Sequence, residues 1–129
     1  MKTVPKSLHY SNTHEWVRQE DDIFTIGITD YAQTMMGDLV YVELPEPESH
    51  IERGEECALI ESTRTAVDVY SPIAGEVVEI NESLLNIPHL INDDPYGRGW
   101  LFRVRPFENE PINLLTPEQY LVQLAAETH

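Results

Sequence analysis

The sequence predicts a mainly β fold, a flattened β-sandwich or barrel with short peripheral helices and one C-terminal helix. Three observations support this class. The β-rich apolar runs are short, turns containing glycine, proline or acidic residues separate them, and helix-like patterns are fewer than strand-like ones. Many short, turn-separated strands are typical of sandwiches and barrels. At 129 residues the default is a single domain over 1–129, with an N-terminal arm at 1–7.

The N-terminal half begins with a predicted β-hairpin. Two β-rich runs, Glu15–Gln19 and Ile23–Ile28, flank an acidic turn, which is a hairpin pattern. A short helix is expected next, because Thr29 or Asp30 can cap its first turn and Gly37 can take the left-handed conformation that ends it.

That helix and the strand after it each have a predicted core-facing side. On the helix we expect Tyr31, Ala32 and Met35 to face inward. Residues 39–44 then alternate as a strand that stops at Pro45, because proline removes a backbone donor from a sheet.

The central block predicts a second hairpin with an exposed polar tip. Strands are expected at 57–62 and 66–71, joined by the tip Thr63-Arg64-Thr65. A turn from Ser71 to Gly75 leads to a third strand at 76–81, which we expect to brace the hairpin.

The C-terminal third predicts a strand between two helical segments. Residues 82–93 form a short helical stretch broken at Pro88, and 100–106 alternate as a half-buried strand. Thr116 can then cap a helix at about 117–126. The apolar stripe of this helix is expected to be Tyr120, Leu121, Leu124 and Ala125.

The charge balance narrows the range of partners. There are 23 acidic and 8 basic residues, a formal net charge of −15, so we expect no binding to nucleic acid or to anionic membranes. Partners with basic patches are favoured instead. Lys2 and Lys6, both in the N-terminal arm, are the only lysines, and the single cysteine allows no intrachain disulfide.

No pattern indicates a catalytic centre, a metal site or a membrane span. The five histidines lack metal-ligand spacing, and no nucleophile–base arrangement or phosphate-binding loop is visible. No apolar run approaches the roughly 20 residues needed to cross a bilayer. We therefore expect a non-enzyme that is cytoplasmic, or in the mitochondrial matrix only if a transit peptide has been removed.

Five segments carry a resemblance to one known family. They are "HEW" at His14–Trp16, "GITDYAQ" at Gly27–Gln33, "GDLVYVELPE" at Gly37–Glu46, "ESTRTAVDVYSPIAGEVVEIN" at Glu61–Asn81 and "NDDPYGRGWL" at Asn92–Leu101. In order and spacing they resemble the glycine cleavage system H proteins, over about residues 8–125.

This resemblance implies the hammerhead fold shared by lipoyl and biotinyl domains, and a carrier rather than an enzyme. In that family a lipoyl-lysine arm carries an aminomethyl group, and electrons, in glycine decarboxylation. The implied partners are glycine decarboxylase (the P protein), aminomethyltransferase (the T protein) and dihydrolipoamide dehydrogenase (the L protein), and possibly a lipoate ligase or lipoyl transferase. We expect a monomer.

This chain departs from the attachment motif of the family at the position that decides the chemistry, the lysine. The family pattern resembles Glu-Ser-Val-Lys-Ala-x-x-Asp-x-x-(Ser/Ala)-Pro, and Arg64 stands at the lysine, between Thr63 and Thr65. The motif positions that match, with the glycine that closes the turn, are Glu61, Ser62, Asp68, Ser71, Pro72 and Gly75. Lipoylation requires a neutral primary amine, which arginine cannot supply because its guanidinium stays protonated. We therefore expect no cofactor on this chain.

The resemblance also implies a cleft that receives the loaded arm. His14, Glu15 and Trp16 would lie beside it, with Glu15 and Asp68 facing the aminomethyl cation. The alternative is that Trp16 is a core residue and Glu15 a solvated strand residue.

Three interpretations of Arg64 remain open from the sequence. The one we favour is a non-lipoylated interaction or regulatory paralogue of the H proteins. The second is a genuine H-protein carrier whose attachment residue was altered by engineering. The third is an unrelated binding module on the same fold.

Overall fold

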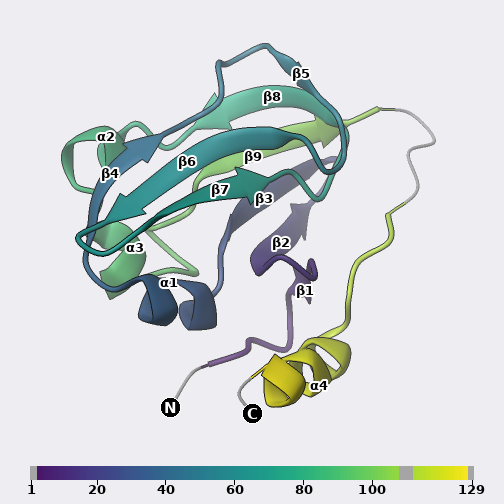
Figure 1. The fold of residues 1–129 in the computed structure, drawn as a ribbon. Helices are drawn as coiled ribbons and strands as arrows, with labels where there is room; N and C mark the ends of the chain where they lie inside the picture. Colours follow the sequence, from purple (N-terminus) through teal and green to yellow (C-terminus); the bar gives the residue numbers. More distant parts are fainter. Residues whose placement is uncertain (1–2, 108–111, 128–129) are drawn as a thin grey trace.

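The computed structural model describes residues 3–107 and 112–127, and two β-sheets form its body (Figure 1). The strands are β1 (His9–Tyr10), β2 (Glu15–Glu20), β3 (Ile23–Ile28), β4 (Leu39–Glu43), β5 (His50–Ile51), β6 (Glu56–Ser62), β7 (Ala66–Tyr70), β8 (Gly75–Ile80) and β9 (Phe102–Pro106). The helices are α1 (Asp30–Met36), α2 (Ser83–Asn86), α3 (Leu90–Asp93) and α4 (Pro117–Glu127). One sheet has the order β1-β2-β3-β9-β8-β5 and the other β4-β6-β7.

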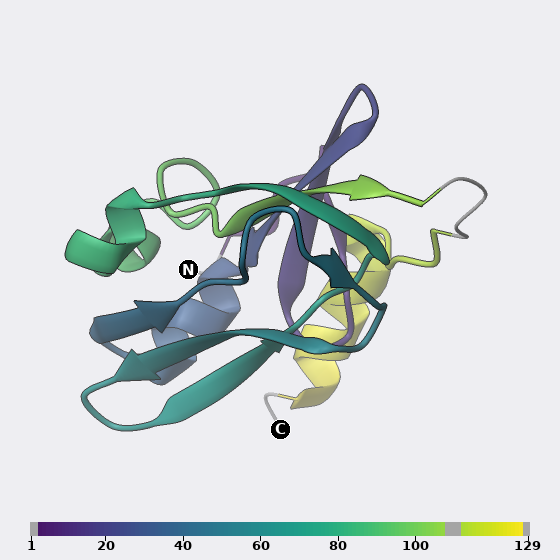
Figure 2. The same cartoon turned by 90° about the horizontal axis from the view of Figure 1, so that it is seen from above.

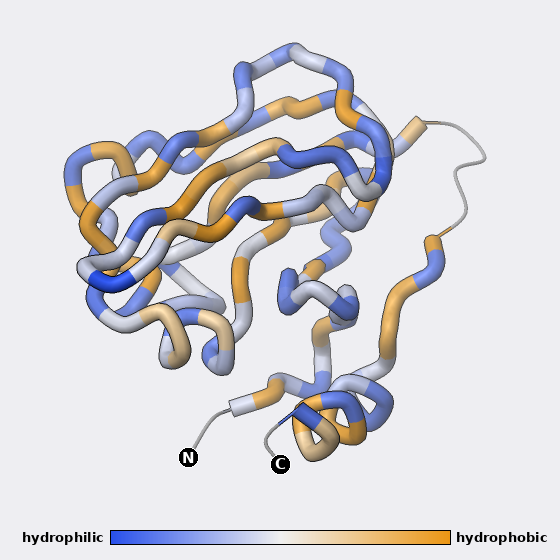
Figure 3. Tube along the Cα trace, in the orientation of Figure 1, coloured by the Kyte–Doolittle hydropathy of each residue, from blue (hydrophilic) through white to orange (hydrophobic). Residues whose placement is uncertain are grey.

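The main core lies between the two sheets. Figure 2 shows the β6–β7 hairpin on one side of the molecule and β8 and β9 on the other. The apolar residues alternate with polar ones along these strands (Figure 3), so that each sheet turns one side inward. The buried side chains that meet include Val17, Ile26, Phe102 and Val104 from the larger sheet and Val42, Ile60 and Val69 from the smaller one. The predicted mainly β fold class is confirmed.

Helix α1 begins and ends as the sequence predicts, but its buried side is different. The hydroxyl of Thr29 accepts a hydrogen bond from the Ala32 N–H, and Gly37 follows the last turn with φ +87°. Met36 is buried at 5 % exposure, whereas Met35 is 60 % exposed. The prediction that Met35 faces the core was wrong, because Ala32 and Met36, four residues apart, share the side of α1 that packs on the core.

Strand β4 contains a β-bulge that the alternating pattern did not predict. Its pairing with β6 shifts by one residue between Leu39 and Tyr41. Val40 and Tyr41 are therefore both exposed, while Leu39 and Val42 on either side are buried.

The strand that braces the β6–β7 hairpin is β4, and not the one that follows it. The prediction that β8 braces the hairpin was wrong, since β8 pairs with β5 and β9 in the larger sheet. The short strands β1 and β5, of two residues each, were not predicted. Pro88 interrupts the helical stretch as expected and separates α2 from α3.

The C-terminal helix packs on a second, smaller core beside β1. Tyr10 and Tyr120 stack there with ring centroids 4.6 Å apart. The predicted capping interaction is present, because the Gln119 N–H donates to the Thr116 hydroxyl at 3.2 Å and the Gln119 side chain accepts from the Thr116 N–H at 2.9 Å. Leu121, predicted as part of the apolar stripe, is instead 50 % exposed.

None of the helices in the described ranges, 3–107 and 112–127, combines the length and the apolar composition that crossing a bilayer requires.

Candidate functional site

The tip of the β6–β7 hairpin is a tight turn built around Ser62. The Ser62 N–H donates to the Thr65 carbonyl at 2.7 Å, which closes the turn. The Ser62 hydroxyl accepts from the N–H groups of Arg64 and Thr65, both at 3.1 Å. Small hydroxyl side chains favour such turns because they bond the neighbouring backbone. Ser62 therefore shapes the tip, and Glu61, one residue earlier, pairs with Tyr41 on the neighbouring strand β4.

The Arg64 side chain lies against the C-terminal end of α1. Its Nε donates to the Met36 carbonyl at 3.3 Å, and its Nη2 donates to the Met35 carbonyl at 3.2 Å. The last carbonyls of a helix have no partner within the helix, and they carry its negative dipole end. The guanidinium thus satisfies two of these acceptors across the gap between hairpin and helix.

The backbone after α1 is adapted to this contact. A Cβ on Gly37 would lie 2.7 Å from Nη2 of Arg64, so that only glycine leaves room for the guanidinium in its observed position. The positive φ of Gly37 also favours glycine. One residue further on, the Asp38 carbonyl accepts a hydrogen bond of 3.2 Å from the Thr63 N–H at the tip.

A cleft of about 170 Å³ separates α1 from the β6–β7 hairpin. It is lined by Thr13, His14, Glu15, Ile28, Tyr31, Ala32, Met35, Met36, Ile60, Val67, Asp68 and Val69. Of the residues that the sequence resemblance assigned to a cleft, His14, Glu15 and Asp68 do line this one. Its walls are otherwise mostly apolar, and its acidic residues favour a ligand that combines an apolar body with a positive charge.

Glu15 is a buried carboxylate at the cleft, and the alternative that it is a solvated strand residue was wrong. It is 2 % exposed and accepts hydrogen bonds from the hydroxyls of Ser11 and Thr13 and, at 3.3 Å, from the Tyr70 N–H. Burial raises the pKa of Glu15 above its usual 4.5, while these hydrogen bonds act in the opposite direction. Sequence reasoning missed Ser11 and Thr13, although the pattern Ser-x-Thr-x-Glu is visible there.

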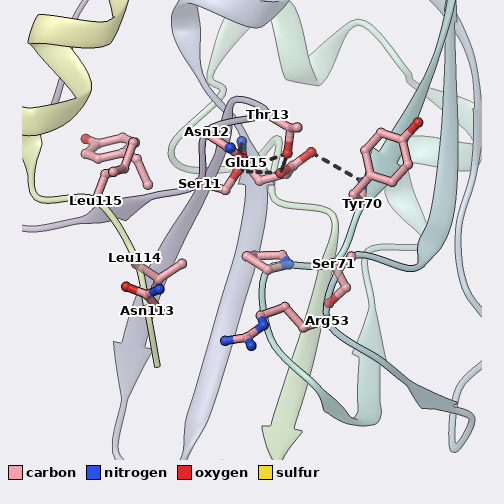
Figure 4. Close-up of a pocket in the computed structure, with 13 residues that line it drawn as sticks. Ser11, Asn12, Thr13, Glu15, Arg53, Tyr70, Ser71, Asn113, Leu114 and Leu115 are labelled. Carbon is pink, nitrogen blue, oxygen red and sulfur yellow. Dashed lines mark hydrogen bonds between the residues drawn. The ribbon is translucent and has the colours of Figure 1, made fainter. Parts of the chain in front are cut away.

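Glu15 also reaches a second, larger cavity of about 510 Å³ (Figure 4). The labelled side chains come from the segment before β2 and its first residue Glu15, from the Arg53 turn, from the Tyr70–Ser71 segment and from the stretch before α4. Pro72 and Ser71 of the predicted attachment motif line this cavity rather than the hairpin tip. The structure therefore divides the predicted motif between two regions joined by Glu15.

Trp16 is a core residue and does not line the cleft. It is fully buried, its Nε1 donates to the Pro95 carbonyl at 2.9 Å, and a Cβ on Gly27 would lie 2.6 Å from its ring. His14 lies at the cleft wall, where Nδ1 is 2.8 Å from the Tyr120 hydroxyl and Nε2 is 3.0 Å from the Glu127 carboxylate of α4. It thereby links the cleft to the C-terminal helix.

The remaining motif residues shape the turn before β8. The Ser71 hydroxyl is buried and donates to the Ile73 carbonyl at 2.7 Å. Gly75 allows β8 and β9 to approach closely, since a Cβ there would lie 2.3 Å from the Arg105 carbonyl oxygen. Asp68 is exposed on β7. Ser71 and Gly75 have structural roles here.

Neither a metal centre nor a reactive thiol is present among residues 3–107 and 112–127. No group of three His, Cys, Asp or Glu side chains there is placed to hold a metal ion. Burial raises the pKa of the Cys57 thiol to about 12, which leaves little thiolate at neutral pH.

Comparison with known proteins agrees with this geometry. The family model described as "Glycine cleavage H-protein" matches residues 8–127. A glycine cleavage system H protein of Coxiella burnetii is 49 % identical over 130 residues, covering 99 % of this chain and all of that protein. One from Thermus thermophilus is 49 % identical over 125 residues, covering 96 % of this chain and 98 % of that protein.

A solved structure gives the same result for the fold. The crystal structure of a glycine cleavage system H protein from Mycobacterium marinum superposes with a TM-score of 0.89 at 37 % identity, covering 95 % of this chain and 99 % of that one. The chain belongs to the glycine cleavage H-protein family, whose members are carriers and not enzymes.

Proposed function

We propose that this chain is an H-protein-like interaction or regulatory protein that carries no lipoyl arm. The observation that supports this most directly is Arg64 at the hairpin tip, in the position that the family pattern assigns to the lipoyl-lysine. Its guanidinium is bound to the Met35 and Met36 carbonyls of α1. Both its chemistry and its contacts argue against an attachment site.

The residues present do not fit a covalently bound lipoyl group. Amide formation needs a primary amine with a free lone pair, and arginine offers none because the lone pair of its guanidinium is delocalised. The lysines, Lys2 and Lys6, lie far from the tip in the sequence. No step of the family's carrier chemistry is therefore assigned to this chain.

The partners that we propose are the enzymes of the glycine cleavage system, with glycine decarboxylase first. This chain has the β6–β7 hairpin with its exposed tip and the adjoining cleft. Its net charge of −15 favours basic partner surfaces. A monomer with this surface would occupy a partner's H-protein site without delivering an aminomethyl group. It would act as a competitor or as an adaptor.

The lipoylation part of the proposal is tested by intact mass spectrometry after co-expression with a lipoate ligase or a lipoyl transferase. We expect no lipoyl increment on the parent chain and an increment on Arg64→Lys. The matched control is Arg98→Lys, which places an amine on another exposed turn and should stay unmodified. A lipoyl increment on the parent chain would refute the proposal.

The interaction part is tested by competition. Purified glycine decarboxylase is titrated with a lipoylated H protein in the presence and absence of this chain. We expect competition that does not depend on lipoate. The absence of both binding and competition at low salt would exclude the adaptor role and favour an unrelated binding module.

A further inference from the structure

We propose that Arg64 is a clamp, a residue that joins the hairpin tip to the C-terminal end of α1 and thereby fixes the width of the cleft between them. This role goes beyond the proposed function, and it holds whether or not the chain binds any enzyme. It rests on the hydrogen bonds that Arg64, on the hairpin side of the cleft, donates to Met36 and Met35 on the helix side. These residues precede Arg64 in the sequence by 28 and 29 positions.

The helix side provides an acceptor site that lacks a cation of its own. Helix α1 has only seven residues and no basic residue in its last turn. Its C-terminal carbonyls carry partial negative charge, which a cation from elsewhere can stabilise. Arg64 supplies that cation with two donors of one planar group, one to each of the consecutive carbonyls of Met35 and Met36.

On the hairpin side, hydrogen bonds within the turn fix the backbone from which the Arg64 side chain extends towards the helix. The Ser62 hydroxyl fixes the Arg64 backbone through a hydrogen bond of 3.1 Å. The Thr63 N–H donates to the Asp38 carbonyl at 3.2 Å, which makes a second tie between the tip and the segment after α1. Gly37 lies between Met36 and Asp38, the two residues whose carbonyls the tip binds, and it has no Cβ in the space that the guanidinium occupies. Hydrogen bonds on the hairpin side and the missing Cβ on the helix side therefore both support the Arg64 contact.

The clamp acts on the cleft because the same residues form both. Met35 and Met36, whose carbonyls Arg64 binds, line one wall, and Val67 and Asp68 of the hairpin line the other. With the tip fixed, the walls cannot separate by bending of the hairpin. A lysine in this position would offer one compact, strongly hydrated ammonium in place of a planar, pre-organised fork, and we expect it to hold the two carbonyls less firmly.

The first test is amide hydrogen exchange followed by NMR, on the parent chain, Arg64→Ala and Arg64→Lys. The reporters are the amides of Thr63, on the tip, and Gly37, at the helix end. We expect exchange at both to accelerate by about three- to tenfold in Arg64→Ala, and by less in Arg64→Lys. The Val77 and Val104 amides in the paired strands β8 and β9 are measured alongside, and unchanged exchange there shows that global stability is not altered.

The matched control is Arg98→Ala. Arg98 is also an exposed arginine, 71 % accessible, and its Nε lies 3.8 Å from the Asp94 carboxylate in the turn after α3. Its removal should leave the Thr63 and Gly37 amides unchanged. Unchanged exchange of these amides in Arg64→Ala would overturn the clamp, and equal protection in Arg64→Lys would overturn the need for a fork.

A second readout addresses the cleft itself. Met35 and Met36 can be labelled with ¹³C at their methyl groups, and a soluble paramagnetic probe reports the access of solvent to each. In the parent chain Met36 is 5 % exposed. In Arg64→Ala we expect its methyl group to become accessible to the probe. If it stays protected while the tip amides exchange faster, Arg64 orders only the turn, and the proposed control of cleft width is refuted.

Discussion

The carboxylate of Glu15 lies between the cleft and the larger cavity, with hydrogen-bond donors on both oxygens. Such a group has two opposing influences on its ionisation. Burial disfavours the charged form, whereas the donors favour it, and the result is a raised pKa. Its consequence can be measured without any ligand, through the stability of the folded chain.

We expect the free energy of unfolding of the parent chain to fall, relative to that of Glu15→Gln, as pH rises from 4.5 to neutral. The folded-state pKa of Glu15 lies above its unfolded value, so its contribution is fully present below about 4.5 and is lost as pH rises through the folded pKa. Urea unfolding at a series of pH values measures this difference. Glu46→Gln, at an exposed loop position, is the control, and parallel pH profiles for the parent and Glu15→Gln would contradict the expectation.

The sequence predicted that Arg64 lies at the tip of the hairpin, but it did not predict where the Arg64 side chain points. The position of Arg64 follows from local turn chemistry, which sequence shows directly. Its contact with Met35 and Met36 depends on how α1 and the hairpin pack, and no local pattern encodes that distance. For the same reason the sequence could not decide whether Trp16 lines the cleft or the core.

Elements with strong local determinants were predicted closely. Helix α4 has its capping residues and its N1 proline in the sequence, and the β2–β3 hairpin has its acidic turn. The two-residue strands β1 and β5 exist only because longer strands pair with them, and a window of two residues carries no periodicity. The bulge in β4 likewise depends on its partner β6.

A buried hydroxyl, that of Tyr120, is one of the contacts that dock α4 on the rest of the chain. The Tyr120 hydroxyl lies 2.7 Å from the Thr29 hydroxyl and 2.8 Å from Nδ1 of His14, and Tyr120 is fully buried. We expect Tyr120→Phe to lower the free energy of unfolding by about 1–3 kcal/mol, because Thr29 loses a buried hydrogen bond and His14 a partly buried one. Chemical denaturation measures the change.

Tyr41→Phe is the matched control for that substitution. Its hydroxyl bonds Glu43 at 2.8 Å on the exposed face of β4, where water can replace it. We expect a change within about 0.5 kcal/mol. Equal effects of the two substitutions would mean that the Tyr120 hydroxyl does not hold α4 in place.

At the scale of the whole molecule, the assignment of strands to sheets could not be predicted from the sequence alone. Strand β8 follows the hairpin in the chain, yet it pairs with β9, some 25 residues later. Short turns allow either arrangement, and the choice depends on how the two apolar faces close over one core. The predicted fold class is nevertheless correct, because both strand arrangements are mainly β folds of the same class.

The net charge of −15 is a property of the whole chain, and its effect on association is testable. We expect binding to glycine decarboxylase to weaken by about tenfold between low and high salt, mainly through a slower association rate. Surface plasmon resonance at several salt concentrations measures this. The double variant Asp38→Asn/Glu61→Gln, next to the tip, should bind more weakly than Glu46→Gln/Glu118→Gln, and the reverse order would place the contact elsewhere.

Strand β7 forms one edge of the three-stranded sheet, where it pairs with β6 alone among residues 3–107 and 112–127. Its sequence, Ala-Val-Asp-Val-Tyr, is rich in β-forming residues, and its first three residues are exposed. Such an edge can pair with the same edge of another molecule, and a central charge is one of the ways in which proteins prevent this. Asp68 places such a charge in the middle of this edge, where it disfavours edge-to-edge pairing whether or not the cleft ever binds a ligand.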